Sequence, residues 1–150
     1  MSTLDFGRSE RLIRINAVGS GFEVDDLELC RAGPSYTIDT VRELRRRGWT
    51  QVHWLIGADM LQILPQWHES EALLQETQFV VMARPDWTMD WDLLPPPFRK
   101  LAGQIVTAPL VEISATDIRR RVAAGKSIDY LTAPGVVDYI RRNGVYRRYA

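Results

Sequence analysis

The sequence predicts an α/β fold in which a mostly parallel sheet is flanked by helices. Two apolar runs of strand length, Val52–Ile56 and Phe79–Ala83, lie between segments with helical periodicity. Alternation of strands and helices is typical of the crossover connections that join parallel strands. A chain of 150 residues suits one domain. We therefore expect a single domain over residues 1–150, with ligands bound beyond the carboxyl ends of the strands.

The first part of the chain contains one more predicted strand and a helix. Residues Phe22–Leu29 alternate apolar and acidic side chains, which predicts a half-buried strand. Gly33–Ser35 has the composition of a turn. From Thr37 the apolar residues recur at helical spacing until Gly48, which favours a helix end.

The two apolar runs predict parallel strands buried on both faces. Short helices are expected over Met60–Leu64 and Glu69–Gln75, and residues 86–100 are expected to be irregular. A further strand is predicted over Gln104–Ile113. Ser114 begins a helix, and Pro134 lies in the first turn of the last helix, which ends at Asn143–Gly144.

Composition limits the class of protein. The chain is 45% hydrophobic and 25% charged, which is ordinary for a globular domain. The single cysteine, Cys30, excludes an intrachain disulfide and is expected to be a small core or edge residue. No signal peptide and no apolar run of about 18 residues is found. We therefore expect a cytoplasmic protein without a membrane partner.

Charge is unevenly spread although the formal net charge is zero. Residues 115–150 hold eight Lys/Arg and three Asp/Glu. A basic end of this kind is found in proteins that bind nucleic acid or phosphate ligands, and also in ordinary solvated helices. The arginines lie around helix surfaces without interleaved aromatic residues, so we expect no nucleic-acid partner.

A phosphate-binding element is predicted at Ser114–Arg119. Ser114 and Asp117 form a capping-box pattern, in which Ser114 accepts a backbone N–H and Asp117 reaches back. A helix N-terminus offers free N–H groups and positive potential, and Thr116 and Arg119 add a hydroxyl and a guanidinium. The alternative is an ordinary capped surface helix.

Two further segments follow the predicted strands. Asp59 comes directly after a strand, where its carboxylate could bind a ribose hydroxyl or a metal-bound water, or simply cap the helix from Met60. Trp67 lies near the ligand edge, where an indole ring can stack on a heteroaromatic substrate; the alternative is a core residue. Neither His53 nor His68 has a nearby base or metal ligand in the sequence.

Taken in order, these elements resemble the bacterial nicotinate-nucleotide adenylyltransferases of the nucleotidyltransferase superfamily. The resemblance runs from about Arg8 to Arg147, while residues 1–7 match nothing. It is carried by four segments: Gly33-Pro34-Ser35-Tyr36-Thr37-Ile38-Asp39-Thr40, then Gly57-Ala58-Asp59-Met60-Leu61 with Trp67, then Ile113-Ser114-Ala115-Thr116-Asp117-Ile118-Arg119, then Val137-Asp138-Tyr139-Ile140 with Gly144-Val145-Tyr146.

The resemblance implies a Rossmann-like fold and a reaction of NAD biosynthesis. The family transfers the adenylyl group of ATP to nicotinate mononucleotide, giving deamido-NAD and pyrophosphate, with Mg²⁺. Carried over by motif, Ser114, Thr116 and Arg119 bind ATP. The mononucleotide is bound by Tyr36, Thr37, Asp59, Trp67 and His68. Trp67 stacks on the pyridine ring, and the backbone N–H of His68 lies near the carboxylate, which favours nicotinate over nicotinamide.

One element of the family is not found in this sequence. The family carries a G-x-F-x-P-x-H-x-G-H loop whose two histidines bind the ATP phosphates, whereas the only histidines here are His53 and His68. We therefore assign no catalytic residue. We expect an incomplete domain that lacks the first strand–loop–helix unit, has impaired activity alone and exposes apolar sheet surface to a possible second copy. The alternative is a non-catalytic remnant that binds nucleotide or a partner.

Overall fold

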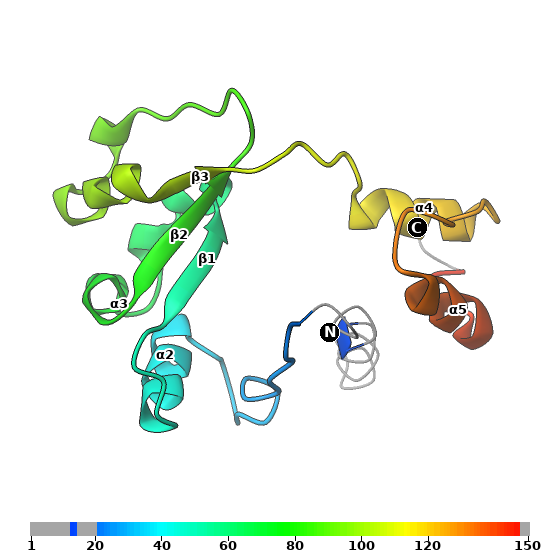
Figure 1. Ribbon diagram of the computed structural model, residues 1–150, viewed down its shortest axis with the longest axis horizontal. Coiled ribbons are helices and arrows are strands. Elements are labelled where there is room, and N and C mark those ends of the chain that lie inside the picture. Colours follow the sequence, from blue (N-terminus) through cyan, green and yellow to red (C-terminus); the bar gives the residue numbers. More distant parts are fainter. Residues whose placement is uncertain (1–12, 15–20, 148–150) are drawn as a thin grey trace. The chain divides into compact units, whose positions relative to one another are not determined.

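The computed structural model describes residues 13–14 and 21–147 (Figure 1). These residues group into two compact units. One consists of Arg31–Leu110, and the other combines described residues from the stretches before and after it. The expectation of one domain over residues 1–150 stays a prediction, and each unit is described by itself.

The larger unit contains a three-stranded parallel sheet. Strands β1 (His53–Gly57), β2 (Gln78–Ala83) and β3 (Ile105–Thr107) are ordered β1-β2-β3. Leu55 pairs with Val80, and Met82 pairs with Val106. The α/β fold with a parallel sheet is thereby confirmed.

Within the described residues of this unit, one face of the sheet is buried and the other is largely open. Ile56, Phe79 and Val81 point into a core that also contains residues of the surrounding helices. On the opposite face Leu55 is 60% exposed and Val106 is 52% exposed. The prediction that β1 is buried on both faces is therefore wrong. Its sequence is a nearly continuous apolar run, but only alternate side chains pack against other described residues.

Helices lie before and between the strands of this unit. Helix α2 spans Thr37–Arg46 and α3 spans Ser70–Glu76, close to the predicted bounds. The segment predicted as a helix over Met60–Leu64 forms two 3₁₀ helices, η1 (Ala58–Gln62) and η2 (Leu64–Gln66). Residues 86–100 are not wholly irregular, because they contain η3 (Trp91–Leu93) and the start of η4 (Pro96–Gln104).

The strand predicted over Phe22–Leu29 is wrong. Residues 22–26 have no regular structure, and residues 27–30 form a turn. The Asp25 carboxylate accepts the N–H of Leu27 at 2.8 Å, and the Asp26 carbonyl accepts the N–H of Cys30 at 3.0 Å. A carboxylate that bonds the local backbone, as that of Asp25 does, competes with strand pairing. Cys30 is consequently exposed and not a core residue.

The strand predicted over Gln104–Ile113 is shorter than expected. Regular pairing stops at Thr107, and a last ladder bond runs from the Ala108 N–H to the Ala83 carbonyl at 2.9 Å. Pro109 follows directly and has no N–H to donate. The regular pairing therefore stops just before a proline, which cannot donate to the ladder.

In the smaller unit, the structure describes two helices after Leu110. Helix α4 spans Ala115–Ala123, and α5 spans Pro134–Asn143 and ends at Gly144 in the left-handed conformation, with φ of 61°. Both helix starts and the final stop agree with the prediction. A separate small core holds this unit together, consisting of Ile128, Val136, Val137, Ile140 and Val145. No helix among the described residues is long and apolar enough to cross a membrane.

Candidate functional site

The carboxyl end of β1 leads directly into the first candidate residues. Gly57 closes the strand and precedes η1, and Asp59 is an exposed residue inside η1. Asp59 is therefore not the cap of the helix that follows, and its carboxylate is folded back against Gly57. A Cβ placed on Gly57 would lie 2.5 Å from the Asp59 Oδ1 atom. A side chain at position 57 would therefore displace that carboxylate from its present place.

Tyr36 and His68 are brought together from distant positions in the sequence. Their rings stack with centroids 4.2 Å apart and planes inclined at 28°. Tyr36 is the residue before α2 and is 41% exposed, while Thr37 is the half-buried first residue of that helix. Two of the predicted mononucleotide residues, Tyr36 and His68, therefore meet near the start of α2, and Thr37 follows Tyr36 directly.

The turn that carries Trp67 is held by its own backbone. The Trp67 N–H donates to the Leu64 carbonyl at 3.1 Å, and the Trp67 carbonyl accepts the N–H of Ser70 at 3.2 Å. The Ser70 hydroxyl adds a bond of 3.0 Å to the Pro65 carbonyl. The indole is half-buried and packs against the main core, so it is partly a core residue and partly available to a ligand.

The backbone N–H of His68 stands out in this turn. It has no acceptor among the residues that the structure describes. The imidazole is about half-exposed, with Nε2 3.5 Å from the Glu69 carboxylate. An available N–H next to a stacked aromatic pair is a suitable donor for an anionic group.

Arg42, which the sequence pattern did not single out, links α2 to the turn after Trp67 and to α3. Arg42 of α2 contacts the Glu69 carboxylate at 2.7 Å and the Glu76 carboxylate at 2.8 Å. Hydrogen bonds to Glu69, and then to Glu76, raise the pKa of Arg42, while the pKa of Glu69 is lowered chiefly by its hydrogen bond with Arg42. The partners lie 27 and 34 positions away, beyond any local sequence pattern.

The predicted ATP-binding residues lie at the start of α4. The Ser114 hydroxyl caps the helix by accepting the Asp117 N–H at 3.0 Å. The predicted reciprocal bond from the Asp117 side chain is not formed with any described residue, so the capping box is half complete. The Thr116 hydroxyl accepts a hydrogen bond from Arg119 Nη2 at 3.2 Å. Ser114 keeps its own hydroxyl proton available for a phosphate oxygen.

Each group of predicted residues is therefore found within one unit. Tyr36, Thr37, Asp59, Trp67 and His68 belong to the sheet unit, and Ser114, Thr116 and Arg119 belong to the helical unit. Within the described ranges no three His, Cys, Asp or Glu side chains converge to hold a metal ion. The described side chains of the two groups offer hydroxyl groups, a guanidinium and aromatic rings.

Comparison with known proteins identifies the class. The model of the cytidylyltransferase-like family matches residues 7–121, and the chain belongs to that family. Within it, the chain belongs with relatives named probable nicotinate-nucleotide adenylyltransferase. The relative from Roseiflexus sp. (strain RS-1) is 39% identical over 128 residues, covering 84% of this chain and 64% of the relative. The relative from Aeromonas salmonicida is 40% identical, covering 91% of this chain and 72% of the relative.

Solved structures share the fold. Nicotinic acid mononucleotide adenylyltransferase of Plasmodium falciparum, complexed with NaAD, has a TM-score of 0.69 at 18% identity and covers 95% of this chain and 74% of that chain. The same enzyme complexed with APC has a TM-score of 0.65. The Rossmann-like nucleotidyltransferase fold is thereby confirmed. The chain spans about 64% of the length of several curated relatives that it matches.

Proposed function

We propose that the chain binds ATP and nicotinate mononucleotide for adenylyl transfer, the reaction that gives deamido-NAD and pyrophosphate. The observation that carries the proposal is the stacked pair of Tyr36 and His68 beside Trp67. It supports a flat aromatic subsite with an adjacent N–H donor, as a pyridine ring with a carboxylate requires. Membership of the family supplies the reaction.

In this reaction the phosphate oxygen of the mononucleotide forms a bond to the α-phosphorus of ATP, and the bond to pyrophosphate breaks. No protein nucleophile is needed, so the residues act by positioning and by stabilising charge. Ser114, Thr116 and Arg119 bind ATP phosphate oxygens. Asp59 binds the mononucleotide through one of its hydroxyl groups, and Thr37 is a further residue of this subsite.

Mg²⁺ is the proposed metal. It is held mainly by phosphate oxygens and water and needs no cage of protein side chains, which fits the donor set of the described residues. When bound, it neutralises charge on the phosphates. We assign no residue of this chain to it. The predicted cytoplasmic location is likewise a proposal, supported by the family.

The expected preference for nicotinate over nicotinamide mononucleotide follows from the carboxylate of the nicotinate ring. A nicotinate carboxylate only accepts hydrogen bonds, so the available N–H of His68 favours it, whereas the amide of nicotinamide mononucleotide presents donors as well as an acceptor. Since the sequence lacks the histidine loop of the family, we expect substrate binding by this chain but no measurable deamido-NAD. Robust turnover by the purified chain would refute the second expectation.

Binding of nicotinate mononucleotide to Trp67→Ala tests the proposal by calorimetry. The loss of stacking is expected to weaken the mononucleotide about tenfold or more and to leave ATP binding nearly unchanged. Trp49→Ala is the control, because Trp49 is exposed and follows the end of α2. Equal losses for both substrates would remove Trp67 from the pyridine subsite.

A further inference from the structure

The imidazole of His68 belongs to a group of aromatic and charged side chains that contact one another. Its ring stacks on Tyr36, with centroids 4.2 Å apart, and its Nε2 atom lies 3.5 Å from the Glu69 carboxylate, at Oε1. Arg42 Nη1 donates to the same Glu69 oxygen at 3.2 Å. Tyr36 and Arg42 come from the start and the middle of α2, whereas His68 and Glu69 lie just before α3. One carboxylate oxygen is therefore shared between an arginine and a histidine.

The charges of this group do not balance while the imidazole is neutral. Arg42 carries one positive charge and contacts two carboxylates, those of Glu69 and Glu76. Their sum is one negative charge beside the ring of His68. The pKa of Arg42 is raised and that of Glu69 is lowered by the contacts between them, so both stay charged near neutral pH. A proton on the imidazole brings the sum to zero and gives Nε2 a hydrogen that faces Glu69.

The same residue supplies the N–H that we assign to the nicotinate carboxylate. Because the ring and the N–H of His68 belong to one residue, an anion bound at the N–H lies within about one Debye length of the ring, ~10 Å at 0.1 M salt. Salt therefore screens the charge of the imidazole only in part at this distance. The His68 side chain is 49% exposed and that of Glu69 is 42% exposed, which limits the effect to a moderate one.

We propose that the His68 side chain makes the preference for nicotinate mononucleotide depend on pH. With a neutral imidazole, the excess negative charge of Glu69 and Glu76 opposes the nicotinate carboxylate. With a protonated imidazole that excess is gone, and the carboxylate is bound more tightly. The amide of nicotinamide mononucleotide is uncharged and does not respond. The preference therefore increases as the pH falls. This role of the ring rests on the proposed function, which uses only the backbone of His68.

The affinities of the two mononucleotides at about pH 8 and about pH 6 test this role, because histidine is the side chain that ordinarily changes charge in this range. Both ligands carry the same phosphate and ribose, so the ratio of their association constants cancels the titration of the phosphate. Calorimetry on the full chain is expected to show a ratio of nicotinate to nicotinamide mononucleotide that rises about threefold to tenfold towards the lower pH. A constant ratio with both ligands bound would overturn the role of the ring alone. Absence of binding at either pH would overturn the proposed function as well.

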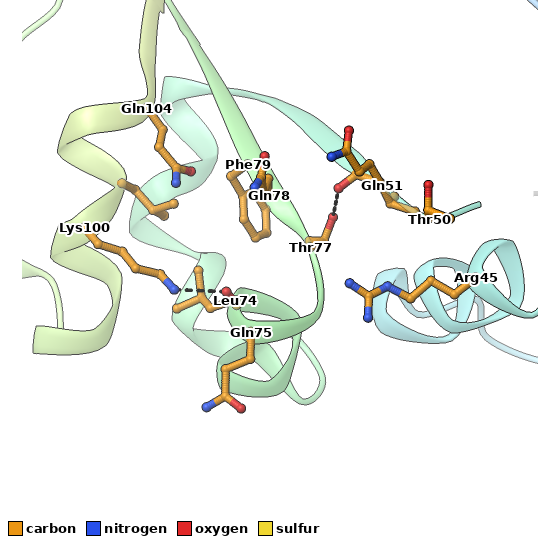
Figure 2. Close-up of a pocket in the computed structure, with 12 residues that line it drawn as sticks. Arg45, Thr50, Gln51, Leu74, Gln75, Thr77, Gln78, Phe79, Lys100 and Gln104 are labelled. Carbon is orange, nitrogen blue, oxygen red and sulfur yellow. Dashed lines mark hydrogen bonds between the residues drawn. The ribbon is translucent and has the colours of Figure 1, made fainter. Parts of the chain in front are cut away.

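Two histidine variants locate the effect. His68→Phe keeps a flat ring for Tyr36 and the backbone N–H but takes up no proton, so its ratio is expected to stay constant. His53→Phe is the matched control, because His53 is the only other histidine in the sequence. It begins β1 directly after Val52, whose carbonyl accepts the Thr77 hydroxyl at 2.7 Å in a separate pocket (Figure 2). This variant is expected to keep the full pH dependence. An undiminished rise in His68→Phe would assign it to another group and overturn the proposal.

The imidazole itself provides a measurement that needs no folded variant. If protonation of His68 strengthens carboxylate binding, bound carboxylate must favour protonation by the same factor. At about pH 7, saturating nicotinate mononucleotide is therefore expected to move the ¹⁵N resonances of the His68 ring towards those of the protonated form. Saturating nicotinamide mononucleotide is expected to move them less. Equal changes with the two ligands would overturn the coupling.

Discussion

Arg42 holds Glu69 by two parallel contacts, Nη2 to Oε2 at 2.7 Å and Nη1 to Oε1 at 3.2 Å. This two-point geometry fixes a carboxylate in orientation as well as position. Glu69 has a left-handed backbone with φ of 47°, which a residue with a side chain rarely adopts. The contact therefore stabilises the conformation of the residue next to His68.

Replacing Arg42 is expected to loosen that turn. Arg42→Ala should weaken nicotinate mononucleotide binding a few-fold and leave ATP binding unchanged, because the His68 N–H loses its fixed direction. Arg42→Lys should restore only part of the binding, since lysine cannot form the two-point contact. Calorimetry with both substrates measures this, and Arg46→Ala on the same helix is the control. Unchanged mononucleotide affinity in Arg42→Ala would show that the turn holds without it.

The stability of the folded chain is expected to fall at acid pH because the Glu43 carboxylate becomes protonated. Hydrogen bonds from Arg46, and then Arg47, lower the pKa of Glu43 from 4.5 to about 2. The unfolded chain binds this proton more readily, so the contribution of Glu43 is fully present above pH 4.5 and is lost as the pH falls towards 2. Urea unfolding across this pH range should show that the free energy of unfolding declines less in Glu43→Gln than in the unchanged chain. In the control Glu71→Gln, a substitution at an exposed position of α3, it should decline as much as in the unchanged chain.

Substitution of Gly57 is expected to disturb Asp59 selectively. In Gly57→Ala the new methyl group meets the Asp59 carboxylate, which must turn away. Mononucleotide binding should weaken, while the sheet pairing of β1 is kept. Gly103→Ala is the matched control, because a Cβ there meets nothing within 4 Å. An unaffected affinity in Gly57→Ala would mean that Asp59 does not contact the mononucleotide.

Two variants of Ser114 separate its capping role from its phosphate role. Ser114→Ala removes the bond to the Asp117 N–H and should destabilise α4 by about 1 kcal/mol. Ser114→Asp keeps a good cap but places negative charge where ATP phosphate is expected. The melting temperature should therefore fall in the alanine variant only. ATP affinity should fall more for the aspartate variant, and equal ATP affinities in the two variants would confine Ser114 to capping.

The sequence by itself determined the parts of this protein that depend on neighbouring residues. The strands around Leu55 and Val81, the helix from Thr37 and the cap at Ser114 were predictable because periodicity, apolar runs and capping are local properties. The predicted strand over Phe22–Leu29 failed for a local reason of another kind. The Asp25 carboxylate bonds the backbone beside it, and a pattern of alternating residue types does not reveal that competition.

Tertiary structure alone decided which distant residues meet. The stacking of Tyr36 on His68 and the pairing of Arg42 with Glu69 join segments tens of residues apart. The spacing of these residues in the sequence does not predict either contact. Both contacts form because the intervening strands and helices fold the chain back on itself. The same holds for exposure: Leu55 belongs to an apolar run, but only the packing of the unit shows that its side chain lies on the open face.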